Sequence, residues 1–224
     1  MKVVIVGNDT PSNHYADIVV NAIIGTGLEN REFRDAYGTL NLWGPQFLVL
    51  RDEFEALRDS YTYSGELRNV VLLFGGSDQS DFTRKVVRAL SGHGFSISVI
   101  AGRAYEHYPE LEADAAVLED VTLYHNITNV SEIYRKADFL FTSPGTALFE
   151  GLCIGIPAVS FYQNRSQVDV FGNFFTCNMF SEETDPLSMM TSVYKNYDAF
   201  RKERDFYNVG GGRKRIIDSI IELI

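Results

Sequence analysis

The sequence predicts an α/β protein with a parallel, Rossmann-like sheet flanked by helices. Apolar runs without alternation, such as Val70–Phe74, are typical of strands that are buried on both faces. Between these runs lie segments such as Asp81–Ser91, in which apolar side chains recur every three or four positions, as on one face of a helix. Regular alternation of strand and helix is the pattern of βαβ units and therefore favours a parallel sheet.

The elements can be placed in chain order from these patterns. Strands are predicted at Lys2–Val6, Ile18–Ile24, Val70–Phe74, Ser96–Ala101, Val121–His125, Asp138–Thr142 and Ala158–Phe161. Within Leu40–Leu50, Gly44-Pro45 divides a strand end from a turn. Helices are predicted at Asp52–Ser60, Asp81–Ser91, Val130–Ala137 with Ser131 as N-cap, Thr146–Ile154, Ser188–Tyr207 and Arg213–Ile224.

The chain divides into two unequal parts. From about residue 66 onward the β/α series is complete, whereas the first 60 or so residues hold two or three strands and little helix. So few elements bury too little surface for an independent domain. We therefore expect a small, incomplete N-terminal α/β segment with its junction over residues 1–62, and a larger domain over residues 63–224.

Composition restricts the partners. The 224 residues carry a formal net charge of −10, which argues against nucleic acid and anionic membranes, because both require a basic face. A small anion is still compatible, since backbone N–H groups can hold it. No run approaches about 18 apolar residues, so we expect no membrane span. Cys153 and Cys177 lack metal-ligand spacing, and no signal peptide is evident, which favours a reducing cytoplasm.

A first glycine loop follows the strand Val70–Phe74. Gly75-Gly76-Ser77-Asp78 leads into a helix that begins near Asp81. Glycines let the backbone approach a ligand without a Cβ, and the start of a helix presents free N–H groups. The loop can therefore hold an anion. An ordinary turn, with Ser77 or Asp78 as the N-cap of the helix, explains the same residues.

A second glycine loop has the same arrangement and adds a carboxylate. Ser143-Pro144-Gly145-Thr146 follows a strand and opens a helix that carries Glu150. Glu150 lies one turn along, on the face of the helix start, where it can accept the hydroxyls of a ribose whose phosphates rest on the loop. The alternative is that Glu150 complements the helix dipole. Its apolar flanks favour a role in ligand binding.

A polar segment ends the next strand at the same edge of the sheet. After Gly155-Ile156-Pro157 and the strand comes Gln163-Asn164-Arg165-Ser166-Gln167. The amides of this segment can read sugar hydroxyls. A plain polar loop is the alternative interpretation.

Taken together and in this order, the motifs resemble a known family. They are the two glycine loops, Asn129-Val130, Lys136-Ala137-Asp138, Gly155-Ile156-Pro157, Asn164…Gln167, Gly210-Gly211-Gly212-Arg213-Lys214-Arg215, and the upstream stretch Gly44-Pro45-Gln46-Phe47-Leu48-Val49-Leu50-Arg51-Asp52-Glu53-Phe54. The pattern resembles the C-terminal nucleotide-binding half of GT-B glycosyltransferase-like proteins. It is most similar to the UDP-sugar hydrolase of pseudaminic acid biosynthesis and to its relatives in spore-coat polysaccharide synthesis. The likeness is good over residues 40–224 and loose over residues 1–40.

The resemblance implies a nucleotide-sugar-binding domain over residues 63–224. In the family, UDP pyrophosphate lies against both glycine loops, the glutamate takes the ribose, and backbone at the Asn-Val element meets the uracil. Pro144 departs from the pattern, because it removes one N–H from the phosphate loop. The implied substrate-binding residues are Gly75, Gly76, Ser77, Asn129, Val130, Ser143, Gly145, Thr146, Glu150, Asn164 and Gln167.

Catalytic residues stay unassigned. The family opens with a glycine loop that carries a histidine for hydrolysis, and nothing like that loop occurs here. We expect surface or capping roles for His14, His93, His107 and His125. Three hypotheses follow: a UDP-sugar hydrolase-like protein, the donor-binding half of a split glycosyltransferase, and a non-catalytic binding protein. All three bind UDP or a UDP-sugar without a metal or cofactor. A second chain, or a second copy in a homodimer, would complete the cleft.

Overall fold

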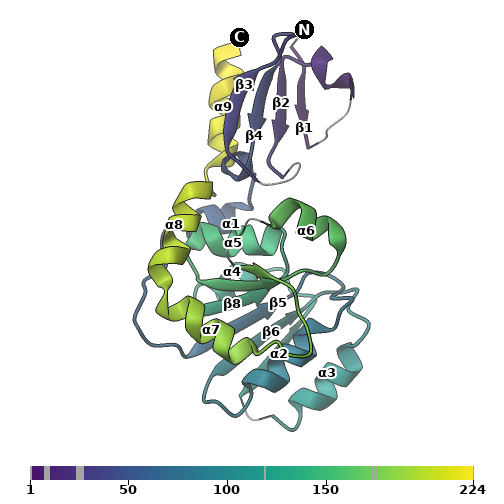
Figure 1. Ribbon diagram of the computed structural model, residues 1–224, viewed down its shortest axis with the longest axis vertical. Coiled ribbons are helices and arrows are strands. Elements are labelled where there is room, and N and C mark those ends of the chain that lie inside the picture. Colours follow the sequence, from purple (N-terminus) through teal and green to yellow (C-terminus); the bar gives the residue numbers. More distant parts are fainter. Residues whose placement is uncertain are drawn as a thin grey trace.

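The computed structural model has two α/β units stacked along the long axis of the molecule (Figure 1). It describes residues 2–7, 11–23, 28–118, 120–172, 174 and 176–223. The smaller unit holds a four-stranded sheet and the larger unit a six-stranded sheet. The predicted strand and helix that end at Ile24 and Ile224 reach beyond the described residues at those two positions.

The sheet of the larger unit is parallel throughout and confirms the predicted fold class. Its order is β10-β9-β8-β5-β6-β7, so the strand order reverses between β5 and β8. This is the order of a doubly wound, dinucleotide-binding sheet. The strands are β5 (Asn69–Leu73), β6 (Ser96–Ala101), β7 (Val121–His125), β8 (Phe139–Thr142), β9 (Ala158–Phe161) and β10 (Cys177–Asn178).

Helices cover both faces of this sheet, because successive side chains of a buried strand point to opposite faces. Val70 and Leu72 pack in one apolar cluster, and Val71 between them packs in the other. The first face is covered by α2 (Phe82–Leu90), α3 (Tyr108–Ala115) and α7 (Pro186–Lys195). The second is covered by α1 (Asp52–Glu55), α4 (Val130–Tyr134), α5 (Thr146–Ile154), α6 (Arg165–Phe171) and α8 (Tyr197–Tyr207).

The smaller unit is built from both ends of the chain. Strands β1 (Val4–Val6), β2 (Ile18–Asn21) and β4 (Leu40–Trp43) are parallel, and β3 (Arg31–Arg34) pairs antiparallel with β4. Short 3₁₀ helices lie at Pro11–Tyr15 (η1) and Pro45–Phe47 (η2), and α9 (Gly212–Leu223) lies beside the sheet (Figure 1). Ile216 of α9 packs with Ile18, Val20, Leu42 and Phe47.

Two features of the smaller unit differ from the prediction. Helix α9 was placed at the end of the 63–224 domain, but it packs on the four-stranded sheet, because an apolar stripe does not specify its partner. The strand β3 was not predicted. All four of its residues are exposed at the sheet edge, and its charged side chains hide a strand pattern.

Two predicted local features of the larger unit are wrong. Ser131 is not an N-cap, because α4 begins at Val130 and Asn129 takes the cap position without a side-chain cap. The segment predicted as a polar loop from Gln163 opens the helix α6, whose N-cap is Asn164. The helix α3 and the short edge strand β10 were not predicted either.

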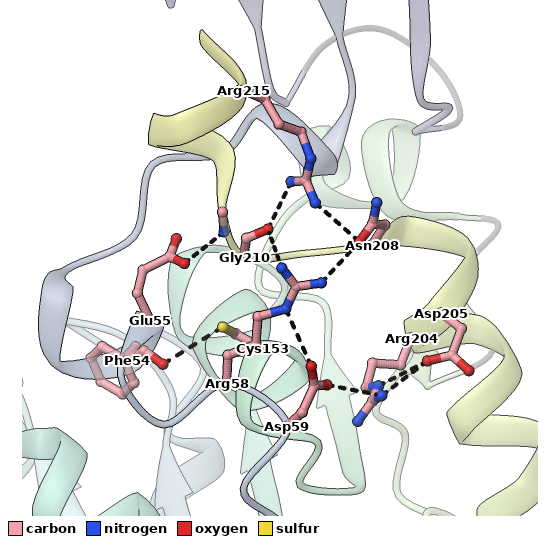
Figure 2. Close-up of polar contacts among 11 residues, drawn as sticks. Phe54, Glu55, Arg58, Asp59, Cys153, Arg204, Asp205, Asn208, Gly210 and Arg215 are labelled. Atoms are coloured by element: carbon pink, nitrogen blue, oxygen red, sulfur yellow. Dashed lines mark hydrogen bonds and ion pairs between the residues drawn. The ribbon is translucent and has the colours of Figure 1, made fainter. Parts of the chain in front are cut away.

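The two segments that connect the units are fastened to each other (Figure 2). Arg58 and Arg215 both donate to the carbonyl oxygen of Gly210 and to Oδ1 of Asn208, at 2.7–3.1 Å. Arg215 also donates to the carbonyl oxygen of Gln46 at 2.6 Å. Two guanidinium groups thus provide hydrogen-bond donors to the carbonyl oxygen of Gly210, where the chain crosses from α8 to α9.

The N-terminus of α9 receives its capping carboxylate from α1. The backbone N–H of Gly211 donates to Oε2 of Glu55 at 2.6 Å. A carboxylate beside the N-terminus of a helix is favourable because it meets the positive end of the helix dipole. The glycine-rich stretch before α9 is therefore already paired with a carboxylate of the same chain.

Gly212 is required by close backbone packing at this crossing. A Cβ added there would lie 2.2 Å from the carbonyl oxygen of Leu48. We expect Gly212→Ala to lower the free energy of unfolding by about 1–3 kcal/mol, which exceeds the gain of about 1 kcal/mol from helix propensity. Urea denaturation measures this change. Gly76→Ala is the matched control, since an added Cβ there meets nothing within 4 Å. Wild-type stability of Gly212→Ala would contradict the packing argument.

Candidate functional site

A cleft of about 610 Å³ lies at the carboxyl ends of β5, β6 and β8, where the strand order reverses. Ligands of open α/β sheets bind at this position. Asn129 does not line the cleft and is exposed at the start of α4. The other predicted site residues do line it: Gly75, Gly76, Ser77, Val130, Ser143, Gly145, Thr146, Glu150, Asn164 and Gln167.

Strand pairing brings the two glycine loops side by side. Leu73 of β5 pairs with Thr142 of β8, and Oγ1 of Thr142 donates to the carbonyl oxygen of Leu73 at 2.6 Å. The first loop also packs closely against Gly102, the residue that follows β6. A Cβ at Gly102 would lie 2.4 Å from the carbonyl oxygen of Gly76, so only glycine permits this approach. Gly102 was not predicted, although a glycine directly after a strand was the available signal.

The first glycine loop does not open onto a free helix N-terminus. Oδ1 and Oδ2 of Asp78 accept from the backbone N–H groups of Phe82 and Thr83, at 3.1 and 2.7 Å. Asp78 is 4% exposed, so its carboxylate fills the start of α2. The N-cap position itself is taken by Asp81, and neither Ser77 nor Asp78 holds it, but the carboxylate of Asp78 accepts from the first two N–H groups of the helix. A phosphate here would meet only the backbone of the loop.

The second glycine loop does open onto a helix N-terminus. No described side chain caps α5, and its first helical bond runs from the N–H of Phe149 to the carbonyl oxygen of Gly145. The N–H groups of Thr146, Ala147 and Leu148 therefore lack acceptors within the helix. An added Cβ at Gly145 would meet nothing within 4 Å, so the space beside the loop is open. An uncapped helix start beside open space has the geometry that anion-binding helix N-termini share.

Glu150 is the buried carboxylate of this site. It is 6% exposed and is the fifth residue of α5, beyond the first turn where a carboxylate complements the dipole. Its Oε1 accepts from Nε and Nη2 of Arg51, both at 3.3 Å. Burial raises the pKa of Glu150, and the adjacent Arg51 opposes that shift. The cleft therefore contains a hydrogen-bond acceptor with one cationic neighbour.

Gln163 braces the two glycine loops and was not among the predicted site residues. Its Nε2 donates to Oδ1 of Asp78 at 2.8 Å and to Oγ of Ser143 at 2.9 Å, and its Oε1 accepts from the N–H of Ser80 at 3.1 Å. One amide thus connects both loops. Because all three bonds join distant segments, only the folded structure could reveal this role.

The predicted amides Asn164 and Gln167 are also engaged within the protein. Oδ1 of Asn164 accepts from the N–H of Gln167 as the N-cap of α6, at 3.1 Å. The side chain of Gln167 accepts from the N–H of Gln163 at 2.7 Å and donates to the carbonyl oxygen of Pro144 at 2.8 Å. These contacts make Gln167 a support for the second glycine loop. The spacing of Asn164 and Gln167, typical of a capping box, was the signal for a helix start.

The charged side chains that line the cleft are acidic. Among the described residues that line it are two carboxylates, Asp78 and Glu150, and no lysine, arginine or histidine. Within the described part of the chain, no group of histidine, cysteine, aspartate or glutamate side chains is arranged to hold a metal ion. Within the same residues, no helix has the length and apolar character needed to cross a membrane. The groups of the cleft that could attract an anion are therefore backbone N–H dipoles and not cationic side chains of the lining.

Solved structures share this two-unit arrangement, which is the fold of GT-B glycosyltransferases. MurG of Acinetobacter baumannii is 13% identical with a TM-score of 0.60, and the match covers 99% of this chain and 67% of MurG. Anabaena HepE, solved in complex with UDP and glucose, is 9% identical with a TM-score of 0.52, over 98% of this chain and 71% of HepE.

Two curated relatives match at the level of sequence. An uncharacterized protein of Methanocaldococcus jannaschii is 33% identical over 232 aligned positions, which cover 99% of this chain and 46% of the relative. The spore coat polysaccharide biosynthesis protein SpsG of Bacillus subtilis is 26% identical over 161 positions, covering 70% of this chain and 47% of SpsG. The chain thus spans about half the length of these relatives. No family model matches it.

We expect Gln163→Leu to destabilise the protein. The substitution keeps the approximate size of the side chain but leaves the buried carboxylate of Asp78 without one of its three donors. The free energy of unfolding should fall by about 1–3 kcal/mol in urea denaturation. Gln79→Leu is the control, because Gln79 is exposed and makes no side-chain hydrogen bond to the described residues. A loss below about 0.5 kcal/mol for Gln163→Leu would show that the brace is dispensable.

Proposed function

We propose that this chain binds the nucleoside diphosphate part of a nucleotide-sugar, with UDP as the nucleotide, in the cleft between the glycine loops. One observation carries the proposal: the uncapped N-terminus of α5 and the buried Glu150 line the same cleft. The diphosphate lies at the free N–H groups of α5 and at the backbone of the first loop. The ribose hydroxyls donate to Glu150.

The base has a less polar part of the cleft available to it. Ile100, Ile127 and Val130 line the side formed by β6 and the turn before α4. Asn126 lies among them in the left-handed conformation, with φ of 51°, and offers amide donors and acceptors. A planar base between apolar side chains, read by the backbone near Asn129 and Val130, fits these surroundings.

The comparisons support the choice of ligand and process. HepE was solved with UDP and glucose, and SpsG is named for spore coat polysaccharide biosynthesis. We propose that the chain acts in cell-surface polysaccharide or nonulosonic acid biosynthesis in the cytoplasm, as a UDP-sugar hydrolase-like protein.

A second candidate is the donor-binding half of a split glycosyltransferase, with the acceptor side supplied by another chain or another copy. The cleft favours it, because it holds UDP by position and offers no free base among its described residues. A nucleotide-sugar-binding protein without catalysis has the same support. Turnover of UDP-sugars by the chain alone, compared with turnover in the presence of a partner chain, distinguishes these functions.

Glu150→Ala should weaken UDP binding by about 1.5–3 kcal/mol, because a charge-assisted acceptor for the ribose is lost. Binding of free pyrophosphate, which has no ribose, should change far less. Isothermal titration calorimetry with both ligands measures the difference. Glu132→Ala is the matched control, since Glu132 lies on α4 with its side chain 57% exposed and paired with Arg135. Equal losses for UDP and pyrophosphate would show that Glu150 does not read ribose.

The chain alone should bind UDP-sugars and hydrolyse them slowly or not at all. Hydrolysis needs a group that activates water, and general base catalysis contributes about 10²–10⁴ in rate. No histidine lines the described cleft, and the carboxylate of Asp78 already accepts three hydrogen bonds. The assay is release of UDP from several UDP-linked deoxyamino sugars, by the chain alone and with candidate partner chains. Full turnover by the chain alone would identify a base outside this assignment.

A further inference from the structure

The segment that joins the two units carries Arg51, whose side chain contacts Glu150, the carboxylate proposed to bind the ribose. Arg51 precedes α1, and its Nε and Nη2 both donate to Oε1 of Glu150 at 3.3 Å. Its Nη1 donates to the carbonyl oxygen of Thr128 at 3.2 Å and lies 3.1 Å from Oε1 of Glu53. The guanidinium carbon also lies 4.7 Å from the centroid of the Phe54 ring. One planar group therefore contacts three elements at once.

Two of these contacts lie at the places where a nucleoside would be recognised. Glu150 is the proposed ribose acceptor, and Thr128 precedes the Asn129–Val130 turn proposed for the base. The donors of a guanidinium have a rigid, planar geometry, so Glu150 and Thr128 are held at a set separation. Lysine, with a single flexible ammonium, cannot reproduce both contacts.

The ionisable groups near Glu150 come from two helices and the residue that precedes α1. They are Arg51, which donates to Glu150, Glu53 of α1, which lies next to Arg51, and the fully buried Tyr134 of α4. Burial raises the pKa of Glu150, the adjacent Arg51 lowers it, and Glu53 raises it. Without Arg51, Glu150 would be protonated over a wider range of pH and would be a weaker acceptor for hydroxyl groups.

We propose that Arg51 is a positioning residue for nucleoside recognition: it fixes Glu150 and the turn at Thr128 relative to each other, so that ribose and base are bound as one unit. The inference rests on the proposed function, because the ligand is the same. Arg51 acts through Glu150 and Thr128. Its loss therefore affects ligands with a nucleoside and spares those without one.

The experiment compares UDP with free pyrophosphate on wild type, Arg51→Gln and Arg51→Lys by calorimetry. We expect Arg51→Gln to weaken UDP binding roughly tenfold or more, with Arg51→Lys intermediate and pyrophosphate binding nearly unchanged. Arg213→Gln is the matched control, because Arg213 of α9 also pairs with α1, at Asp52, without touching Glu150. If Arg51→Gln fails to fold, Arg51→Lys decides. Equal weakening of UDP and pyrophosphate overturns the proposal.

The pH profile separates positioning from general damage to the fold. In wild type, UDP affinity should fall as pH falls through the pKa of Glu150, since the protonated group loses its charge. In Arg51→Gln that pKa is higher, so the loss should begin at higher pH. A purely structural effect would lower affinity at every pH without moving the midpoint, and an unmoved midpoint overturns the proposal.

A double-mutant cycle tests the connection between the two side chains. In the Glu150→Gln background, Arg51→Gln should cause a clearly smaller loss of UDP affinity than in the wild type, because the charged partner is already gone and only the contact with Thr128 remains to be lost. Additive losses would overturn the positioning role while leaving UDP binding by the wild type intact. Absence of UDP binding by the wild type would instead reject the proposed function, and the inference with it.

Discussion

The site depends on the parallel pairing of β5 with β8. This pairing aligns Leu73 with Thr142 at the point where the strand order reverses. The hydroxyl of Thr142 donates to the carbonyl oxygen of Leu73, which joins the ends of the two strands. Both strands then turn into glycine-containing loops at one edge of the sheet. Since helices leave the two strands on opposite faces, the edge between them stays open, and the cleft forms there.

The two glycine loops follow one sequence pattern but have different physical roles. At the first, the carboxylate of Asp78 occupies the start of α2, so the positive end of that helix is neutralised from within. At the second, α5 has no described side-chain cap, and its N–H groups are left for a ligand. Of the two helices, α5 is therefore the one whose N–H groups face the cleft without a side-chain cap. Gln163 holds the first loop next to it through hydrogen bonds to Asp78 and Ser143.

The sequence predicted the central elements well because strands buried on both faces and the helices between them have strong local patterns. Ser96–Ala101 and Thr146–Ile154 have the predicted bounds. The sequence alone does not show whether the loop that contains Asp78 binds a ligand or is a turn that caps a helix, because both kinds of loop use the same residue types. It missed β3 because the exposed, charged residues of that strand lack a strand pattern. It also missed the brace made by Gln163 and the partner of α9, because both depend on contacts between segments distant in sequence.

The junction between the two units places Arg51 next to the candidate site of the larger unit. The chain crosses between the units twice, and the crossings are tied together by Arg58, Arg215 and the carboxylate of Glu55 (Figure 2). Arg51 lies on one of these crossings, one turn before Glu55 and in contact with Glu150. The residue that sets the charge next to the proposed ribose site therefore belongs to the structure that orients the two units. A change in that orientation and a change in nucleotide recognition would act through the same short segment.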